Sequence, residues 1–103
     1  MLPEIRPARL AQGASATRET AGRVAVGGLM NLLDEILAGR GERGFALVRP
    51  PGHHAEPDRA MGFCFFNNVA LGAQYLLDRH GLDRVMIVDV DAQHGNGTQS
   101  VFY

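Results

Sequence analysis

Two short, uninterrupted apolar runs most constrain what this chain can fold into. Residues 45–48 (FALV) follow Gly44 and stop at an Arg-Pro-Pro-Gly turn, and residues 85–88 (VMIV) stop at Asp89. Neither run alternates apolar with polar residues, which is typical of strands that are covered on both faces, as in a parallel sheet. The sequence therefore predicts two buried parallel strands.

A helical pattern precedes the first run, and another lies between the two runs. Apolar residues recur at steps of three and four from about residue 15 to Leu37, followed by the glycine-containing residues 39–41, so we expect one long amphipathic helix there. Asn67 or Asn68 can cap a second helix that ends near Gly81. Strand, helix and strand in this order form a right-handed βαβ unit, which predicts an α/β fold.

Composition limits the chain to one small domain. It has 103 residues, 46% of them apolar, and its ten basic and eleven acidic side chains give a net charge of −1. The scattered charges form no basic face for nucleic acid, and no apolar stretch reaches the ~20 residues of a membrane helix. The amino terminus has no signal-peptide pattern, and the single cysteine, Cys64, fits a reducing compartment. We therefore expect a soluble, cytoplasmic protein.

The most polar segments follow directly after the two predicted strands. His53 and His54 lie in the loop after the first strand, and Asp89, Asp91 and Gln93 lie at the end of the second. Ligands of open α/β sheets bind outside the carboxyl ends of the strands. These side chains are therefore expected to share one cleft.

Each polar segment has a functional and a structural interpretation. In an extended backbone Asp89, Asp91 and Gln93 point to one side, and a bound cation would relieve the repulsion between the two carboxylates. A solvated acidic pair beside an ordinary glycine turn fits the spacing equally well. Adjacent imidazoles in a loop can serve as general acid and base because they change charge near neutral pH. Histidines that only complete the surface or the core are the alternative.

Three blocks of sequence, in order and spacing, closely resemble the zinc-dependent histone deacetylase and acetylpolyamine amidohydrolase superfamily. The blocks are residues 49–55 (RPPGHHA), 62–68 (GFCFFNN) and 89–99 (DVDAQHGNGTQ). The NGTQ ending is more similar to the class II and bacterial amidohydrolase branch than to class I. The resemblance covers about residues 15–103, so we expect a partial deacetylase domain there, preceded by an irregular arm over residues 1–14.

The resemblance implies a three-layer, arginase-like α/β fold with a parallel sheet, of which this chain holds a partial piece containing the βαβ unit. It also implies zinc-dependent hydrolysis of an acetylated amine, either acetyl-lysine in a protein or an acetylated polyamine. Structural potassium is implied as well, at backbone oxygens around Asp89, Asp91 and Gln93.

By the same resemblance, four residues have catalytic roles. His53 and His54 handle protons and stabilise the transition state, with His54 as the expected general base. Asp89 orients His53 and tunes its charge. Asn96 stands where a partner of His54 is expected.

The metal and substrate positions include a departure from the family pattern. Asp91 matches a zinc-binding carboxylate, and Gly62 and Phe63 match the wall of a narrow apolar substrate tunnel. The family has a zinc-binding histidine at position 93, whereas this chain has Gln93, followed by His94. A neutral carboxamide is a weaker zinc donor than imidazole. We therefore expect reduced zinc affinity unless the loop shifts to bring His94 in.

The chain is also shorter than members of the family, and by the resemblance we expect it to lack the later segments that supply another zinc-binding Asp and a transition-state Tyr. We expect a fragment or truncated product of a deacetylase, or one part of an assembly whose other chain completes the site. A catalytically inactive deacetylase-like binding module is the second function class, and a metal-independent structural domain is the third. The sequence leaves open whether the chain alone is an enzyme.

Overall fold

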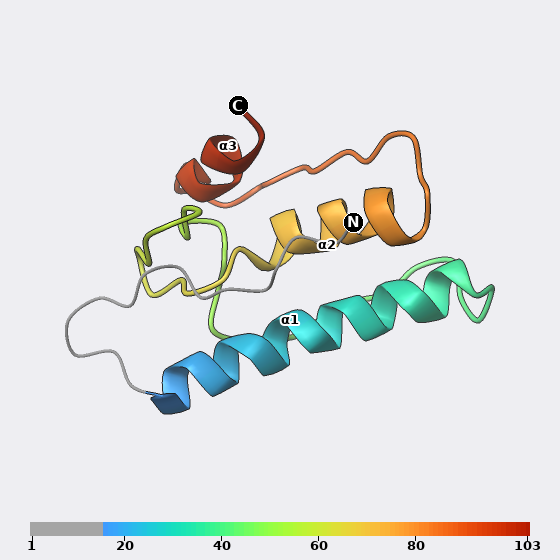
Figure 1. The fold of residues 1–103 in the computed structure, drawn as a ribbon, viewed down its shortest axis with the longest axis horizontal. Coiled ribbons are helices and arrows are strands. Elements are labelled where there is room, and N and C mark those ends of the chain that lie inside the picture. The colour runs from blue at the N-terminus through green and yellow to red at the C-terminus, as the bar shows by residue number, and fades with distance from the viewer. Residues whose placement is uncertain (1–15) are drawn as a thin grey trace.

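The computed structural model describes residues 16–103, whose regular structure consists of three helices (Figure 1). Helix α1 spans Ala16–Leu37, α2 spans Asn68–Arg79 and α3 spans Asn96–Phe102. In Figure 1, α1 and α2 lie one above the other, and α3 lies beyond the amino-terminal end of α2. None of these helices is long and apolar enough to cross a membrane. The arm predicted for residues 1–14 lies outside the described residues.

The two predicted helices are confirmed, and their ends follow from particular residues. Helix α1 ends before Gly39, whose φ is +83°, and α2 ends before Gly81, whose φ is +65°. Glycine adopts such left-handed backbone angles without a steric penalty. Asn67 caps α2, because its side-chain oxygen accepts the Ala70 N–H at an N···O distance of 3.1 Å.

The core lies between α1 and the loop that leads into α2. Val26 of α1 is completely buried against Phe65 and Phe66, and a smaller cluster pairs Ala55 with Cys64. Burial raises the pKa of the Cys64 thiol, which keeps this side chain protonated and unreactive. The core therefore fixes the loop before α2 against α1.

A polar cluster joins α1 to the carboxyl-terminal part of α2. The Asp34 carboxylate on α1 accepts hydrogen bonds from the Tyr75 hydroxyl and from His80 Nε2, the latter at 2.9 Å. These bonds, the tyrosine's first, lower the pKa of the Asp34 carboxyl. The Tyr75 and His80 rings meet edge to face, with centroids 5.4 Å apart. The helices are thus held together by apolar packing at one end and by polar contacts at the other.

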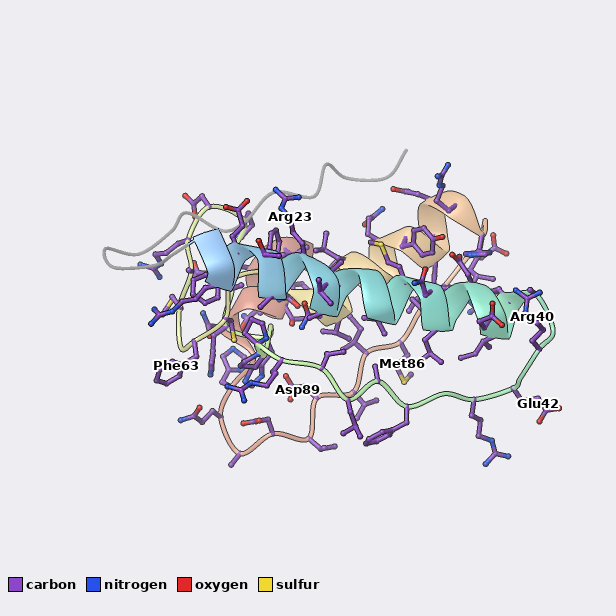
Figure 2. All side chains as sticks on the ribbon, turned by 90° about the horizontal axis from the view of Figure 1, so that it is seen from below. Arg23, Arg40, Glu42, Phe63, Met86 and Asp89 are labelled. Carbon is purple, nitrogen blue, oxygen red and sulfur yellow. The ribbon has the colours of Figure 1, made fainter. Side chains whose placement is uncertain are left out.

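The expectation of two regular parallel strands is wrong for this structure. Residues 43–48 and 84–91 are extended but carry no ladder of backbone hydrogen bonds. The described residues contain only two isolated antiparallel bridges, Glu56 with Arg59 and Met61 with Cys64. Figure 2 shows both extended segments below α1, each passing from the Arg40 end of the molecule toward the Asp89 end. The βαβ unit expected in this piece of the fold is therefore not formed as a paired sheet within residues 16–103.

Exposure of the apolar side chains gives the physical reason. Phe45 and Leu47 are 83% and 87% exposed, and Met86 and Val88 are 86% and 73% exposed, whereas the intervening Ile87 is partly buried. The sequence pattern predicts that both faces of each strand are buried, but the described residues cover only one face of each extended segment. Strand pairing needs a neighbouring backbone at ~4.8 Å along its whole length, and neither segment has one in this part of the chain.

Helix α3 is a further difference, because the sequence analysis predicts no helix there. The helix has seven residues, contains Gly97, and its N-cap Gly95 makes no side-chain capping bond. Glycine lowers helix propensity, so the local sequence does not predict this helix. Its position matters for the site, since it begins at Asn96.

Candidate active site

Two loops far apart in sequence meet at the start of α3: the histidine loop (residues 52–56) and the acidic loop (residues 89–95). The Gly97 N–H donates to the His53 carbonyl oxygen at an N···O distance of 2.9 Å. A β-carbon at position 97 would lie only 2.2 Å from the Ala55 carbonyl oxygen. Only glycine permits so close an approach of two backbones, so Gly97 allows the loops to form one site.

His53 pairs with Asp89. His53 Nδ1 lies 2.7 Å from Asp89 Oδ2, and because an ionised carboxylate only accepts, the Nδ1 atom carries the proton. The other carboxylate oxygen, Oδ1, accepts the Asp91 N–H at 3.0 Å. The bond from Asp91, followed by the bond from His53, lowers the pKa of the Asp89 carboxyl. Asp89 therefore stays ionised and holds the imidazole in one orientation.

His54 pairs with Asn96. His54 Nδ1 lies 2.6 Å from Asn96 Oδ1, and His54 Nε2 lies 3.3 Å from Gln93 Oε1. The amide nitrogen of Asn96 donates to the His54 carbonyl oxygen at 3.4 Å and to Glu56 Oε1 at 3.3 Å. The bonds to Asn96 and then to Gln93 raise the pKa of the His54 imidazole. The structure thus brings together both residue pairs that the family resemblance implies.

Alternate residues of the acidic loop face the two histidines as expected, although the backbone bends at residues 92–93. Asp89 contacts His53, Asp91 Oδ2 lies 4.0 Å from His53 Nε2, and Gln93 contacts His54. The two imidazole rings are adjacent, with centroids 4.1 Å apart and planes tilted by 41°. Both Nε2 atoms therefore face Asp91 and Gln93, on one side of the site.

The predicted metal position does not offer the donors of a zinc site. Asp91 supplies a carboxylate, but Gln93 supplies a neutral carboxamide, and His94 Nε2 is 2.5 Å from Gln99 Oε1 of α3. Within residues 16–103, no group of three or more His, Cys, Asp or Glu side chains is arranged to hold a metal ion. Catalytic zinc sites use three protein ligands of these types, so the residues present do not fit zinc.

The predicted substrate-wall residues lie beside the histidine loop. Gly62 has φ +53°, and a β-carbon there would lie 2.6 Å from His54 Cδ2, so its backbone packs against the imidazole. Phe63 has φ +66°, is 87% exposed and projects outward in Figure 2. A cavity of about 400 Å³ lies beside it, lined in part by Arg49 and Pro51. Their role in substrate binding stays a prediction.

The sequence analysis does not identify the residues that hold the two loops of the site in place through hydrogen bonds. Asn67 caps α2 with its oxygen and donates through Nδ2 to Thr98 Oγ1 at 3.1 Å and to the Ala55 carbonyl oxygen at 3.4 Å. Glu56 holds the amide of Asn96. A polar pair directly after an apolar stretch is the one sequence signal for Asn67, and it indicates only the cap.

The arrangement is suited to proton transfer. Each imidazole has its Nδ1 atom held by an oxygen, which leaves the two Nε2 atoms as the proton-handling positions. One imidazole can accept a proton while its neighbour donates one, as general acid–base catalysis requires. The different partners, a carboxylate for His53 and a carboxamide for His54, give the two rings different electrostatic surroundings.

Comparison with known proteins covers the same region. A family model described as "Histone deacetylase domain" matches residues 11–103. Histone deacetylase 9 of Homo sapiens is 54% identical over 83 residues, which are 81% of this chain and 8% of that protein. The histone deacetylase-like amidohydrolase of Pseudomonas aeruginosa is 48% identical over 81 residues, 79% of this chain and 21% of that protein.

A solved structure shares the fold of this region. The crystal structure of the HDA15 HD domain matches with a TM-score of 0.74 and 51% sequence identity, over 80% of this chain and 23% of that chain. The described helices and loops therefore have the arrangement of one part of a deacetylase domain. Since the family model covers most of its residues, the chain belongs to the histone deacetylase family.

Proposed function

We propose that this chain supplies the histidine part of the active site of a deacetylase that hydrolyses acetylated amines. The substrate class is acetyl-lysine in proteins or acetylated polyamines. The observation that carries the proposal is the pair of adjacent imidazoles, His53 and His54, each held at Nδ1 by its own partner. Amide hydrolysis needs a base that activates water and an acid that protonates the leaving amine.

The roles of the residues follow from these contacts. His54, held by Asn96, acts as the general base, and its neighbour His53, held by ionised Asp89, stabilises the transition state and shares proton transfer. Gly62 and Phe63 line the path of the acylated amine. The names of the relatives, a histone deacetylase and a deacetylase-like amidohydrolase, support this reaction class.

Other parts of the active site must come from other polypeptide segments. The chain spans 8% and 21% of the length of the two curated relatives. We propose zinc and potassium only for the complete site. Within residues 16–103, Asp91 is the residue that we assign as a charged zinc ligand. We also propose that a complementing chain completes the site. We place the protein in the cytoplasm and propose neither nucleic-acid nor membrane partners for it.

One observation favours a second candidate, a catalytically inactive binding module. Gln93 stands at the predicted metal position and contacts His54 Nε2, the atom through which a general base would act. In this alternative the site binds an acetylated partner without turnover.

A chimera tests whether the histidine pairs of this chain support catalysis. The segment of the Pseudomonas aeruginosa amidohydrolase that matches this chain is replaced by the chain's own residues, with Gln93→His included. We expect this chimera to hydrolyse an acetyl-lysine peptide within about tenfold of the parent rate, a barrier difference of ~1.4 kcal/mol, because its histidine pairs have the required partners.

The parent enzyme and the melting temperatures of both proteins are the controls. A chimera that melts like the parent but does not hydrolyse the peptide would show that these histidine pairs do not support catalysis. That result would favour the binding module instead.

A further inference from the structure

We infer that Gln93 makes the metal side of this site incomplete, so that the chain binds zinc weakly and Gln93→His strengthens zinc binding by adding an imidazole donor beside Asp91. The choice of zinc rests on the proposed function. The inference itself concerns affinity for the metal and does not depend on turnover. It assigns residue 93 as the position that determines whether this deacetylase site holds its metal.

Gln93 makes two hydrogen-bonding contacts within the site. Its side-chain Oε1 lies 3.3 Å from His54 Nε2, and its backbone N–H donates to Asp91 Oδ1 at 2.8 Å. The first contact directs the carboxamide oxygen toward the proton-handling histidine. The second engages Oδ1 of the neighbouring Asp91, whose Oδ2 lies 4.0 Å from His53 Nε2.

The donor chemistry of this pair is poor for zinc. A carboxamide oxygen is neutral and a weak donor, whereas zinc sites use imidazole nitrogen, thiolate or carboxylate. With Gln93 at its position, Asp91 is the one residue of the predicted pair that brings a negative charge. An imidazole at position 93 would add a strong donor close to Asp91, whose Oδ1 accepts the N–H of residue 93.

His94 cannot take over this position in the described arrangement. His94 points toward α3, where its Nε2 is 2.5 Å from Gln99 Oε1. The backbone just beyond is held in place, since Gly97 N–H donates to the His53 carbonyl oxygen. Turning His94 inward would require both the bond to Gln99 and this close backbone contact to rearrange.

Zinc titration of the full 103-residue chain tests the inference. The dissociation constant of Zn²⁺ is measured by competition with a chromophoric chelator for the unaltered chain, Gln93→His, Gln93→His with Asp91→Asn, and His94→Ala. We expect Gln93→His to bind zinc at least about tenfold more tightly than the unaltered chain, a gain of ~1.4 kcal/mol. The added Asp91→Asn change is expected to cancel this gain, and His94→Ala to leave the affinity of the unaltered chain as it was.

Circular dichroism of each variant shows that helix content is retained, so a changed affinity reports on the ligands. Equal affinity of the unaltered chain and Gln93→His would overturn the inference, because the carboxamide would then serve as well as an imidazole. Weaker binding by His94→Ala would also overturn it, since His94 would then be a ligand. Neither result bears on whether the Gln93→His chimera hydrolyses an acetylated peptide, so the inference and the proposed function can fail separately.

Discussion

Replacing Gly97 by alanine is expected to lower the free energy of unfolding by about 3 kcal/mol. The added β-carbon would lie 2.2 Å from the Ala55 carbonyl oxygen and 2.7 Å from its carbonyl carbon. Both are backbone atoms, so no side-chain rotation relieves the overlap. Helix α3 would have to move away from the histidine loop, which breaks the Gly97 N–H bond to His53. Urea unfolding followed by circular dichroism measures the effect.

Gly27→Ala is the matched control. Gly27 lies within α1, and a β-carbon there meets nothing within 4 Å. Alanine is the better helix former, so this change is expected to raise the unfolding free energy by up to ~1 kcal/mol. If Gly97→Ala proves as stable as the unaltered chain, the close contact between α3 and the histidine loop does not exist in solution.

Replacing His54 by alanine in the Gln93→His chimera is expected to lower kcat by about 100- to 10,000-fold, the range for loss of a general acid or base. The imidazole is removed from between Asn96 and the metal-side position 93, so no group remains there to take the proton from water. KM should change much less, since this ring acts on the reacting atoms. Initial rates with an acetyl-lysine peptide give both constants.

Two further variants of the same chimera distinguish a direct catalytic role of His54 from effects on its orientation and on the stability of the fold. Asn96→Ala removes a bond that positions His54, and its loss of kcat is expected to be about tenfold, in line with one hydrogen bond of ~1.4 kcal/mol. His80→Ala removes a histidine that contacts Asp34 instead of the site, and kcat should be unchanged. Full activity of the His54→Ala chimera would remove His54 from the mechanism.

The helices could be predicted from the sequence because local signals agree with the packing. Apolar periodicity marks α1 and α2, Asn67 provides a cap, and Gly39 and Gly81 take the left-handed angles that end the two helices. These features depend on neighbours within a few residues. The core residues Phe65 and Phe66 follow from the same apolar stretch that leads into α2.

The strands could not be predicted correctly because a strand depends on partners that local sequence does not contain. Residues 45–48 and 85–88 keep the alternating exposure of strands, yet their outer side chains are uncovered and their backbones unpaired in residues 16–103. Helix α3 is missed for a related reason. Its place is determined by the contact of Gly97 with the histidine loop, a tertiary interaction that overrides weak propensity.

The two loops of the candidate site could be predicted because they follow the two apolar runs, whereas the residue pairs are expected only from the resemblance to the family. The pairs His53–Asp89 and His54–Asn96 form as the resemblance implies. The contact of Gln93 with His54 could not be predicted, since it depends on how the acidic loop folds over the histidine loop.

The central claim is that this chain by itself sets His53 and His54 with their Nδ1 atoms donating to fixed oxygens. Proton–nitrogen NMR of the ¹⁵N-histidine-labelled chain tests it directly, and the other two histidines serve as internal controls. We predict a proton on Nδ1 of both His53 and His54, and on Nε2 of His80 and His94, whose Nε2 atoms contact oxygens of Asp34 and Gln99. A spectrum in which Nδ1 of His53 or His54 is unprotonated would contradict the account.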